Sequence, residues 1–318
     1  MVPILQKRNR PVLQVAMIVL VLVFSSVKTN AQQSPMYAQY MFNMMNINPA
    51  YAGSRGTTTF TGLSRNQWVG IRNAPKTTTL SMDMPVNNER IGLGFQLYDD
   101  KLGVERTTGF NFSYAFRIRM SDAGTLSLGL QGGVLNYRAN YTTLNTRQAG
   151  DPVFAQDLSG ILPAAAAGVF YNSDNFYAGI STPALLKTKI RYDAQADVTY
   201  AGQDLQLYTT AGFVARLNDN VVLKPSTLIK IASGAPVQFD LNLNAWFHDI
   251  ISVGASYRTG DAYVGMAELQ LTKQFRMGYA YEHPMTDLRS YSSGTHELML
   301  RFELGGGNQS KAVSPRYF

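Results

Sequence analysis

The sequence contains no cysteine and only three histidines among its 318 residues. The absence of cysteine excludes disulfides, thiol catalysis and thiolate metal sites. His248, His283 and His296 each stand alone in their segments, without a second ligand at metal spacing. No G-x-S-x-G motif, which would mark a nucleophilic serine, accompanies any of them. We therefore expect no metal, no cofactor and no enzymatic activity.

Charge is also scarce, because only 15% of the residues are charged whereas about a quarter is typical of soluble domains. The formal net charge is +7, but four cations, Lys7, Arg8, Arg10 and Lys28, lie in the first 31 residues, which contain no acid. The remaining chain therefore carries only +3. This small excess argues against a surface that binds nucleic acid.

The first 31 residues predict a cleaved signal peptide. Basic residues precede an apolar run, Val12 to Phe24, and Thr29-Asn30-Ala31 offers the small residues that signal peptidase requires. The run has 13 residues, whereas a membrane-spanning helix needs about 20. We place the cut after Ala31, with no cysteine nearby to carry a lipid, and expect an exported protein.

The rest of the chain has no second long apolar run, and its strongest pattern is alternation. In residues 237–247 one face carries Val237, Phe239, Leu241, Leu243, Ala245 and Phe247, and the other carries Gln238, Asp240, Asn242, Asn244 and Trp246. The same pattern recurs in residues 205–217 and 297–302. Alternation predicts strands with one apolar and one polar face, but a soluble β-sandwich would alternate as well.

The number of strands and the lengths of their connections favour a membrane barrel. We expect 14 strands, starting near Thr57, Lys76, Arg90, Thr107, Thr125, Ala164, Asn175, Leu205, Val221, Val237, Ile251, Asp261, Phe275 and Thr295. The connections alternate between short turns and longer loops, the longest at 138–163, 182–204 and 284–294, with one exception at Thr259-Gly260. Bacterial outer-membrane barrels have this asymmetry. The predicted fold is therefore an all-β, transmembrane antiparallel β-barrel of about 14 strands.

Charged residues on the polar faces predict what lies inside this barrel. They are Arg216, Lys230, Asp240, Glu268, Arg276, Glu282 and Arg301. A Lys or Arg facing lipid at the midplane would cost about 2–4 kcal/mol, so we expect them to point into the lumen. Charges of both signs favour a filled lumen, although a wet pore remains the alternative.

Tyrosines close to the expected strand ends predict girdles at the two membrane interfaces. They are Tyr98, Tyr114, Tyr137, Tyr171, Tyr177, Tyr200, Tyr208, Tyr257, Tyr263, Tyr279 and Tyr281. The alternative is the ordinary preference of tyrosine for strands.

The chain divides into four predicted segments. After the signal peptide (1–31), residues 32–56 are rich in Met, Tyr and Asn and do not alternate, which favours an irregular, plug-like element packed in or under the lumen. The alternative is a disordered leader, but the aromatic content argues against it. Residues 57–304 form the barrel, and residues 305–318 form a C-terminal periplasmic tail.

Several motifs also carry a family resemblance. They are Gln39-Tyr40-Met41-Phe42-Asn43, Ile47-Asn48-Pro49-Ala50-Tyr51-Ala52-Gly53, Arg65-Asn66-Gln67-Trp68-Val69-Gly70, Ala74-Pro75-Lys76-Thr77, Ile91-Gly92-Leu93-Gly94 and Thr295-His296-Glu297. The chain resembles, over essentially its whole mature length, the PorP/SprF family of Bacteroidetes outer-membrane proteins.

The resemblance implies an outer-membrane component of type IX protein secretion and gliding motility. Such a protein helps to secrete large adhesins, or retains them at the cell surface, by engaging their C-terminal domains. Periplasmic ring or peptidoglycan-binding components and membrane lipid are further expected partners, and nucleic acid is not. A different function, an outer-membrane transport channel for small or hydrophobic solutes, stays open, as does a membrane-embedded hydrolase.

Six residues are candidates for supporting the plug or a docking surface. They are Asn48, Pro49, Tyr51, Arg65, Gln67 and Trp68. The alternative is that the same residues only close the floor of the barrel.

Overall fold

The computed structural model describes residues 36–121, 124–144, 154, 156–186, 188–191, 199–203, 205–232 and 235–304. For 188–191 and 199–203 only the backbone is described. The predicted signal peptide and the predicted C-terminal tail lie outside these residues. In the described part of the chain, no helix is both long and apolar enough to cross a bilayer.

Strands make up most of the described chain. They are β1 (Thr58–Asn66), β2 (Lys76–Val86), β3 (Ile91–Leu102), β4 (Glu105–Arg119), β5 (Thr125–Ala139), β6 (Leu158–Asn172), β7 (Phe176–Thr182), β8 (Thr188–Arg191), β9 (Thr199–Gln203), β10 (Gln206–Phe213), β11 (Ala215–Asn218), β12 (Val221–Ala232), β13 (Gln238–Phe247), β14 (Ile251–Arg258), β15 (Ala262–Gln270), β16 (Phe275–Pro284) and β17 (Thr295–Leu304). Strands β8 and β9 pair only with each other, in the connection between β7 and β10.

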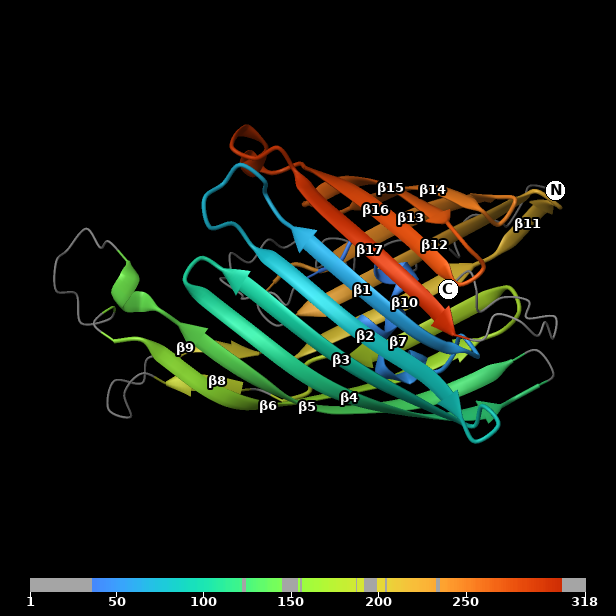
Figure 1. The fold of residues 1–318 in the computed structure, drawn as a ribbon, viewed down its shortest axis with the longest axis horizontal. Helices are drawn as coiled ribbons and strands as arrows, with labels where there is room; N and C mark the ends of the chain where they lie inside the picture. The colour runs from blue at the N-terminus through green and yellow to red at the C-terminus, as the bar shows by residue number, and fades with distance from the viewer. Residues whose placement is uncertain are drawn as a thin grey trace, which may run out of the picture.

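The other strands form one antiparallel sheet that closes on itself (Figure 1). β1 pairs with β17, and β10 pairs with both β7 and β12. β10 and β11 are two parts of one wall strand, interrupted at Val214. The result is a closed barrel of 14 strands, which confirms the predicted fold class. Closure pairs every described wall strand on both sides except the short β11, which pairs only with β12. Such pairing is what a sheet in hydrocarbon requires.

The two faces of the wall differ as the alternation predicts. In β13, Leu241 and Leu243 are exposed on the outside, whereas Asp240 and Asn244 are buried on the inside. β17 repeats the pattern with exposed Leu298, Leu300 and Phe302 and buried Glu297, Met299 and Arg301. The outer wall is therefore an apolar surface for lipid, and the inner wall is polar.

The connections also sort by end. Short turns join β2 to β3, β4 to β5, β6 to β7, β11 to β12, β13 to β14 and β15 to β16; we call this the turn end. The long connections at 140–157, 183–205 and 285–294 lie at the other end, the loop end. Besides the expected exception at 259–261, two further connections at the loop end are short, Gly103-Val104 and residues 233–237.

Three sequence-based expectations need correction. The sixth strand begins at Leu158, not near Ala164, because residues 158–163 pair with β5. Tyr98, Tyr137, Tyr177 and Tyr208 lie on the inner face and belong to no girdle, whereas Tyr114, Tyr257, Tyr263 and Tyr279 are exposed on the outer face. Arg216 pairs with the inward-facing Val222 but is exposed, because it lies beyond the interruption at Val214 near the turn end. The side chain of Tyr200 lies outside the described residues.

We expect Leu243→Arg to destabilise the barrel in lipid by about 2–4 kcal/mol, because Leu243 lies in the middle of β13 on the lipid-facing side. Leu271→Arg, in the turn between β15 and β16, should cost about 0–1 kcal/mol because it lies near an interface. Reversible unfolding in liposomes measures both values. Equal costs for the two variants would contradict the lipid-facing placement of Leu243.

Candidate functional site in the barrel lumen

Residues 36–56 run inside the barrel and end at the start of β1 (Figure 1). We call them the plug segment. It contains three short 3-10 helices, η1 (Tyr40–Phe42), η2 (Met44–Asn46) and η3 (Pro49–Tyr51), and nearly all of its side chains are buried. A barrel of eight strands can be filled by its own wall side chains, whereas one of 14 is wider. The plug segment fills the space that the wall side chains leave in this wider lumen.

Local sequence explains why the plug segment is irregular. Pro49 stands at the first position of η3, where its missing N–H costs nothing. The Asn48 Oδ1 accepts a hydrogen bond of 3.0 Å from the Ala50 N–H, which caps the turn, and the Asn48 Nδ2 donates to the Val169 carbonyl of β6 at 3.0 Å. Asn48 thus stabilises η3 and fixes it to the wall.

Glycines in the wall allow the backbone of the plug segment to approach closely. A Cβ built on Gly92 of β3 would collide with the backbone of Ala52, and one built on Gly129 of β5 would collide with the backbone of Ala50. Because backbone cannot move aside cheaply, these positions require glycine.

We expect Gly129→Leu to destabilise the docked plug by about 1–3 kcal/mol, because the new side chain overpacks the contact with Ala50. Gly132→Leu is the matched control, since Gly132 lies on the same strand, faces outward and has no heavy atom within 4 Å of a built Cβ. Protease protection of the plug segment in the folded barrel reports the difference. Equal protection in both variants would contradict the close approach.

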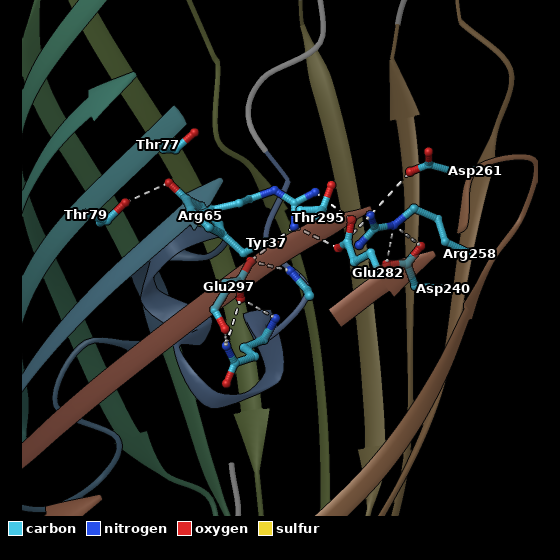
Figure 2. Close-up of polar contacts among 12 residues, drawn as sticks. Tyr37, Arg65, Thr77, Thr79, Asp240, Arg258, Asp261, Glu282, Thr295 and Glu297 are labelled. Atoms are coloured by element: carbon cyan, nitrogen blue, oxygen red, sulfur yellow. Dashed lines mark hydrogen bonds and ion pairs between the residues drawn. The ribbon is translucent and has the colours of Figure 1, made fainter. Parts of the chain in front are cut away.

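At the loop end, the carboxylate of Glu297 holds the beginning of the plug segment (Figure 2). It accepts hydrogen bonds from the backbone N–H of Ala38 at 2.9 Å and of Gln39 at 2.8 Å. The Tyr37 hydroxyl shares a hydrogen bond of 2.8 Å with Thr79 of β2. Burial raises the pKa of Tyr37 to about 12, so this hydroxyl keeps its proton at neutral pH.

Arg65 of β1 joins Glu297 to a second buried carboxylate. Its two terminal nitrogens each lie 2.7 Å from an oxygen of Glu282 on β16, and Nη1 also lies 3.2 Å from Glu297. The side chains of all three residues are at most 5% exposed. Bidentate pairing of this kind gives both strength and a fixed geometry.

Arg258 of β14 extends the same network. Its Nε lies 3.0 Å from Asp240 of β13, and its Nη1 lies 3.3 Å from Asp261 and 3.4 Å from Glu282. Two arginines therefore face four carboxylates, and the N–H groups of the plug segment offset part of the excess negative charge at Glu297. We call these six side chains the charge network (Figure 2): Arg65, Arg258, Asp240, Asp261, Glu282 and Glu297.

Nearer the turn end, basic side chains of the wall and of the plug segment itself bind Phe42 and Gly53. The Phe42 carbonyl accepts hydrogen bonds from Arg55 at 3.0 Å and from Arg301 of β17. The Lys224 ammonium lies 5.6 Å from the centre of the Phe42 ring, within range of a cation–π interaction. The Gly53 carbonyl accepts a hydrogen bond of 3.0 Å from Arg117. The plug segment is thus fixed at both halves.

The six candidate residues lie in three places. Asn48, Pro49 and Tyr51 lie in the plug segment and pack against the wall, with Tyr51 stacked edge-on against Phe170 at 5.4 Å. Arg65 lies in the charge network. Gln67 and Trp68 are half-buried at the loop end, where the Trp68 N–H donates to the Thr295 hydroxyl at 3.2 Å.

The sequence did not single out Arg258 or the holding role of Glu297. Both could have been found by parity, that is, by which side of the strand the alternation of odd and even positions assigns to a residue. Arg258 alternates in phase with the inward Ser252 and Ser256, and Glu297 with Met299 and Arg301.

Within the described residues, no three His, Asp or Glu side chains are grouped in a way that could hold a metal ion. The lumen is built to hold a peptide segment by charge and hydrogen bonds.

These features define a membrane-spanning, plugged β-barrel. The family model for the type IX secretion system membrane protein PorP/SprF matches residues 29–302. The chain therefore belongs to the PorP/SprF family. This confirms the family resemblance, whose motifs include those of the plug segment and of the β1 end.

Solved structures share the barrel only in outline. A KdgM porin is 7% identical, with 78% of this chain and 99% of that one covered and a TM-score of 0.39. A Pseudomonas aeruginosa FadL homologue is 12% identical, with coverage of 87% and 96% and a TM-score of 0.43. The CymD monoaromatic hydrocarbon channel is 9% identical, with coverage of 86% and 94% and a TM-score of 0.46. No curated protein matches the chain.

Proposed function

We propose that this protein is an outer-membrane barrel that helps the type IX machinery to secrete large adhesins or retains them at the cell surface. The observation that carries the proposal is the filled lumen. The plug segment is held to the wall by Glu297 of the charge network at its beginning, by Arg301 at Phe42 and by Arg117 at Gly53. A barrel filled in this way suits a docking platform better than a path for solutes.

In this proposal the loop end faces the cell exterior, as the long loops of bacterial outer-membrane barrels do. In this orientation both ends of the barrel wall lie on the periplasmic side, because Thr58 of β1 pairs with Leu304 of β17 at the turn end. Contact with periplasmic ring or peptidoglycan-binding components at that end stays a prediction.

The loop end offers an apolar surface for a protein partner. The connection after β1 pairs with the connection before β17, through hydrogen bonds of 2.8 Å from Val69 N–H to the Gly294 carbonyl and 2.7 Å from Ser293 N–H to the Val69 carbonyl. Val69 is 39% and Tyr291 75% exposed beside this contact. Exposed apolar side chains on an ordered backbone are suited to anchoring a protein surface.

The double variant Val69→Ser/Tyr291→Ser tests the docking surface. We expect cells that carry it in place of the wild-type chain to release an adhesin into the medium that the wild type secretes and retains at the surface. Met120→Ser/Leu271→Ser is the control, because both residues are exposed at the turn end. Normal surface display of every large adhesin with the Val69/Tyr291 variant would count against this docking surface, and normal display in a deletion strain would refute the function.

Conduction of small or hydrophobic solutes is the second candidate function, favoured by the polar inner wall. Liposomes that contain the purified full-length protein separate the two functions. Solute flux at the level of protein-free liposomes is expected for a docking platform. Robust flux through the wild-type barrel would favour the channel.

A further inference from the structure

Four cations form one continuous row on the outer face of the wall, at the loop end. They are Lys76 of β2, Lys101 of β3, Arg106 of β4 and Arg138 of β5, and all four are exposed. The strand register makes them direct neighbours: Lys76 pairs with Lys101, Lys101 with Arg106, and Arg106 with Arg138. We call this set the basic row.

The basic row stands at a defined height above the apolar belt. Two residues further from the loop end, the same strands carry a polar row, Thr78, Asp99, Thr108 and Asn136, and two residues further still an apolar row, Leu80, Leu97, Phe110 and Val134. The four apolar side chains are 44–54% exposed. Two residues of a strand span roughly 7 Å. The cations therefore lie roughly 14 Å along the strands from lipid-facing side chains, at the level of headgroups.

Like charges directly opposite each other destabilise a sheet, and the protein offsets little of this repulsion. Asp99 is the acid that the described structure pairs with the basic row, through a contact of 2.7 Å between its Oδ1 and the Arg106 Nε. The Arg106 side chain remains 62% exposed despite that contact. Four cations with one acid leave a strong positive field on this part of the rim.

The excess charge is local to β2–β5. On β14–β16, the outward row near the loop end consists of Tyr257, Tyr263 and His283, paired across the strands. The rings of Tyr257 and Tyr263 lie 5.3 Å apart, as expected of an interfacial aromatic belt. One side of the rim thus suits neutral headgroups, and the other suits anionic ones.

We propose that the basic row binds the phosphate groups of an anionic lipid in the outer leaflet. Arginine and lysine side chains are long enough to reach phosphates beside the wall, and arginine can bind them with two parallel hydrogen bonds. The bound lipid would neutralise the repulsion within the row and fix the orientation of the β2–β5 wall in the leaflet. This inference rests on the outward orientation of the loop end in the proposed function.

The test uses the full-length protein in detergent micelles titrated with lipid A, with retained lipid counted by native mass spectrometry. The variant Lys76→Gln/Lys101→Gln/Arg106→Gln/Arg138→Gln should retain less than about a tenth of the lipid A that the wild type retains, since each cation near an anionic surface contributes roughly fivefold. The control variant Arg90→Gln/Arg119→Gln/Arg216→Gln/Lys273→Gln removes the same charge from exposed positions near the turn end. It should retain lipid A like the wild type.

Equal retention in the wild type and the basic-row variant would overturn the inference, as would equal losses in both variants. Retention that is unchanged while adhesin display falls would assign the row to an acidic protein surface instead, and would also overturn it. Because the assay contains no adhesin, its failure leaves the proposed function standing. Normal adhesin display in a deletion strain, conversely, would refute the proposed function and leave the lipid A result intact.

Discussion

Replacing Arg65 with alanine is expected to destabilise the folded barrel by about 3–5 kcal/mol, because it leaves the buried carboxylates of Glu282 and Glu297 without their main counter-ion. Removing one partner of a buried ion pair leaves an unpaired buried charge. This costs far more stability than replacing both partners by apolar side chains. The free energy of unfolding in liposomes, from urea titration, gives the value. The plug segment should also lose protease protection near Ala38.

Arg106→Ala is the matched control for Arg65→Ala. Arg106 also lies 2.7 Å from a carboxylate, that of Asp99, but its side chain is 62% exposed. Water screens exposed pairs, so Arg106→Ala should leave the free energy of unfolding nearly unchanged. A loss of less than about 1 kcal/mol on Arg65→Ala would mean that Arg65 is solvated like Arg106 and that the charge network is not buried.

Deleting residues 36–56 is expected to turn a closed barrel into a conducting one. The 14 strands of the wall would remain, but the side chains that fill the lumen would be gone, and a wide barrel without a filling element holds an aqueous channel. Solute flux into liposomes should rise clearly above the wild-type level. Circular dichroism dominated by strand shows that the wall has folded.

A point variant tests the role of the plug segment in blocking solute flux without deleting any residue. Glu297→Ala removes the acceptor for the Ala38 and Gln39 N–H groups and leaves the wall sequence otherwise intact. It should raise flux less than the deletion does. A folded deletion variant with wild-type flux would show that the lumen is closed by something other than the plug segment.

The barrel wall could be predicted from the sequence because alternation with a period of two is a local property. The expected starts at Lys76, Thr125 and Ile251 coincide with those of β2, β5 and β14. The start of β6 was misplaced because Gly160 and Pro163 are typical of loops. Their strand conformation comes from pairing with Tyr137 and Val134 of β5, which no local pattern reveals.

The inward direction of the lumen charges was predictable, but their partners were not. Asp240, Glu282 and Arg301 are buried inside, as their position opposite the apolar faces predicted. Arg65 and Glu282, however, are 217 positions apart in the chain. They meet only because β1 closes the barrel against β17, which lies beside β16. Such pairs depend on barrel closure and strand register, which are determined by the whole chain and not by any local sequence pattern.

Tyrosine shows how two local signals can conflict. Position near a strand end favoured an interfacial girdle for Tyr137, and parity with the buried Leu135 places it inside instead. Parity decides because a side chain cannot change faces without a shift of the whole strand. Applied to each tyrosine in turn, parity would have separated Tyr137 and Tyr208 from the exposed Tyr257 and Tyr263.

The most direct test is a crosslink between the plug segment and the inner wall. The chain has no cysteine of its own, and the Asn43 Nδ2 donates to the Ser81 Oγ at 3.0 Å. A short bifunctional thiol reagent should join the folded Asn43→Cys/Ser81→Cys variant in high yield. It should not join Asn43→Cys/Leu80→Cys, because Leu80 faces outward and is 54% exposed. Crosslinking of the Leu80 pair, or of neither pair, would contradict a barrel that faces lipid outside and encloses residues 36–56.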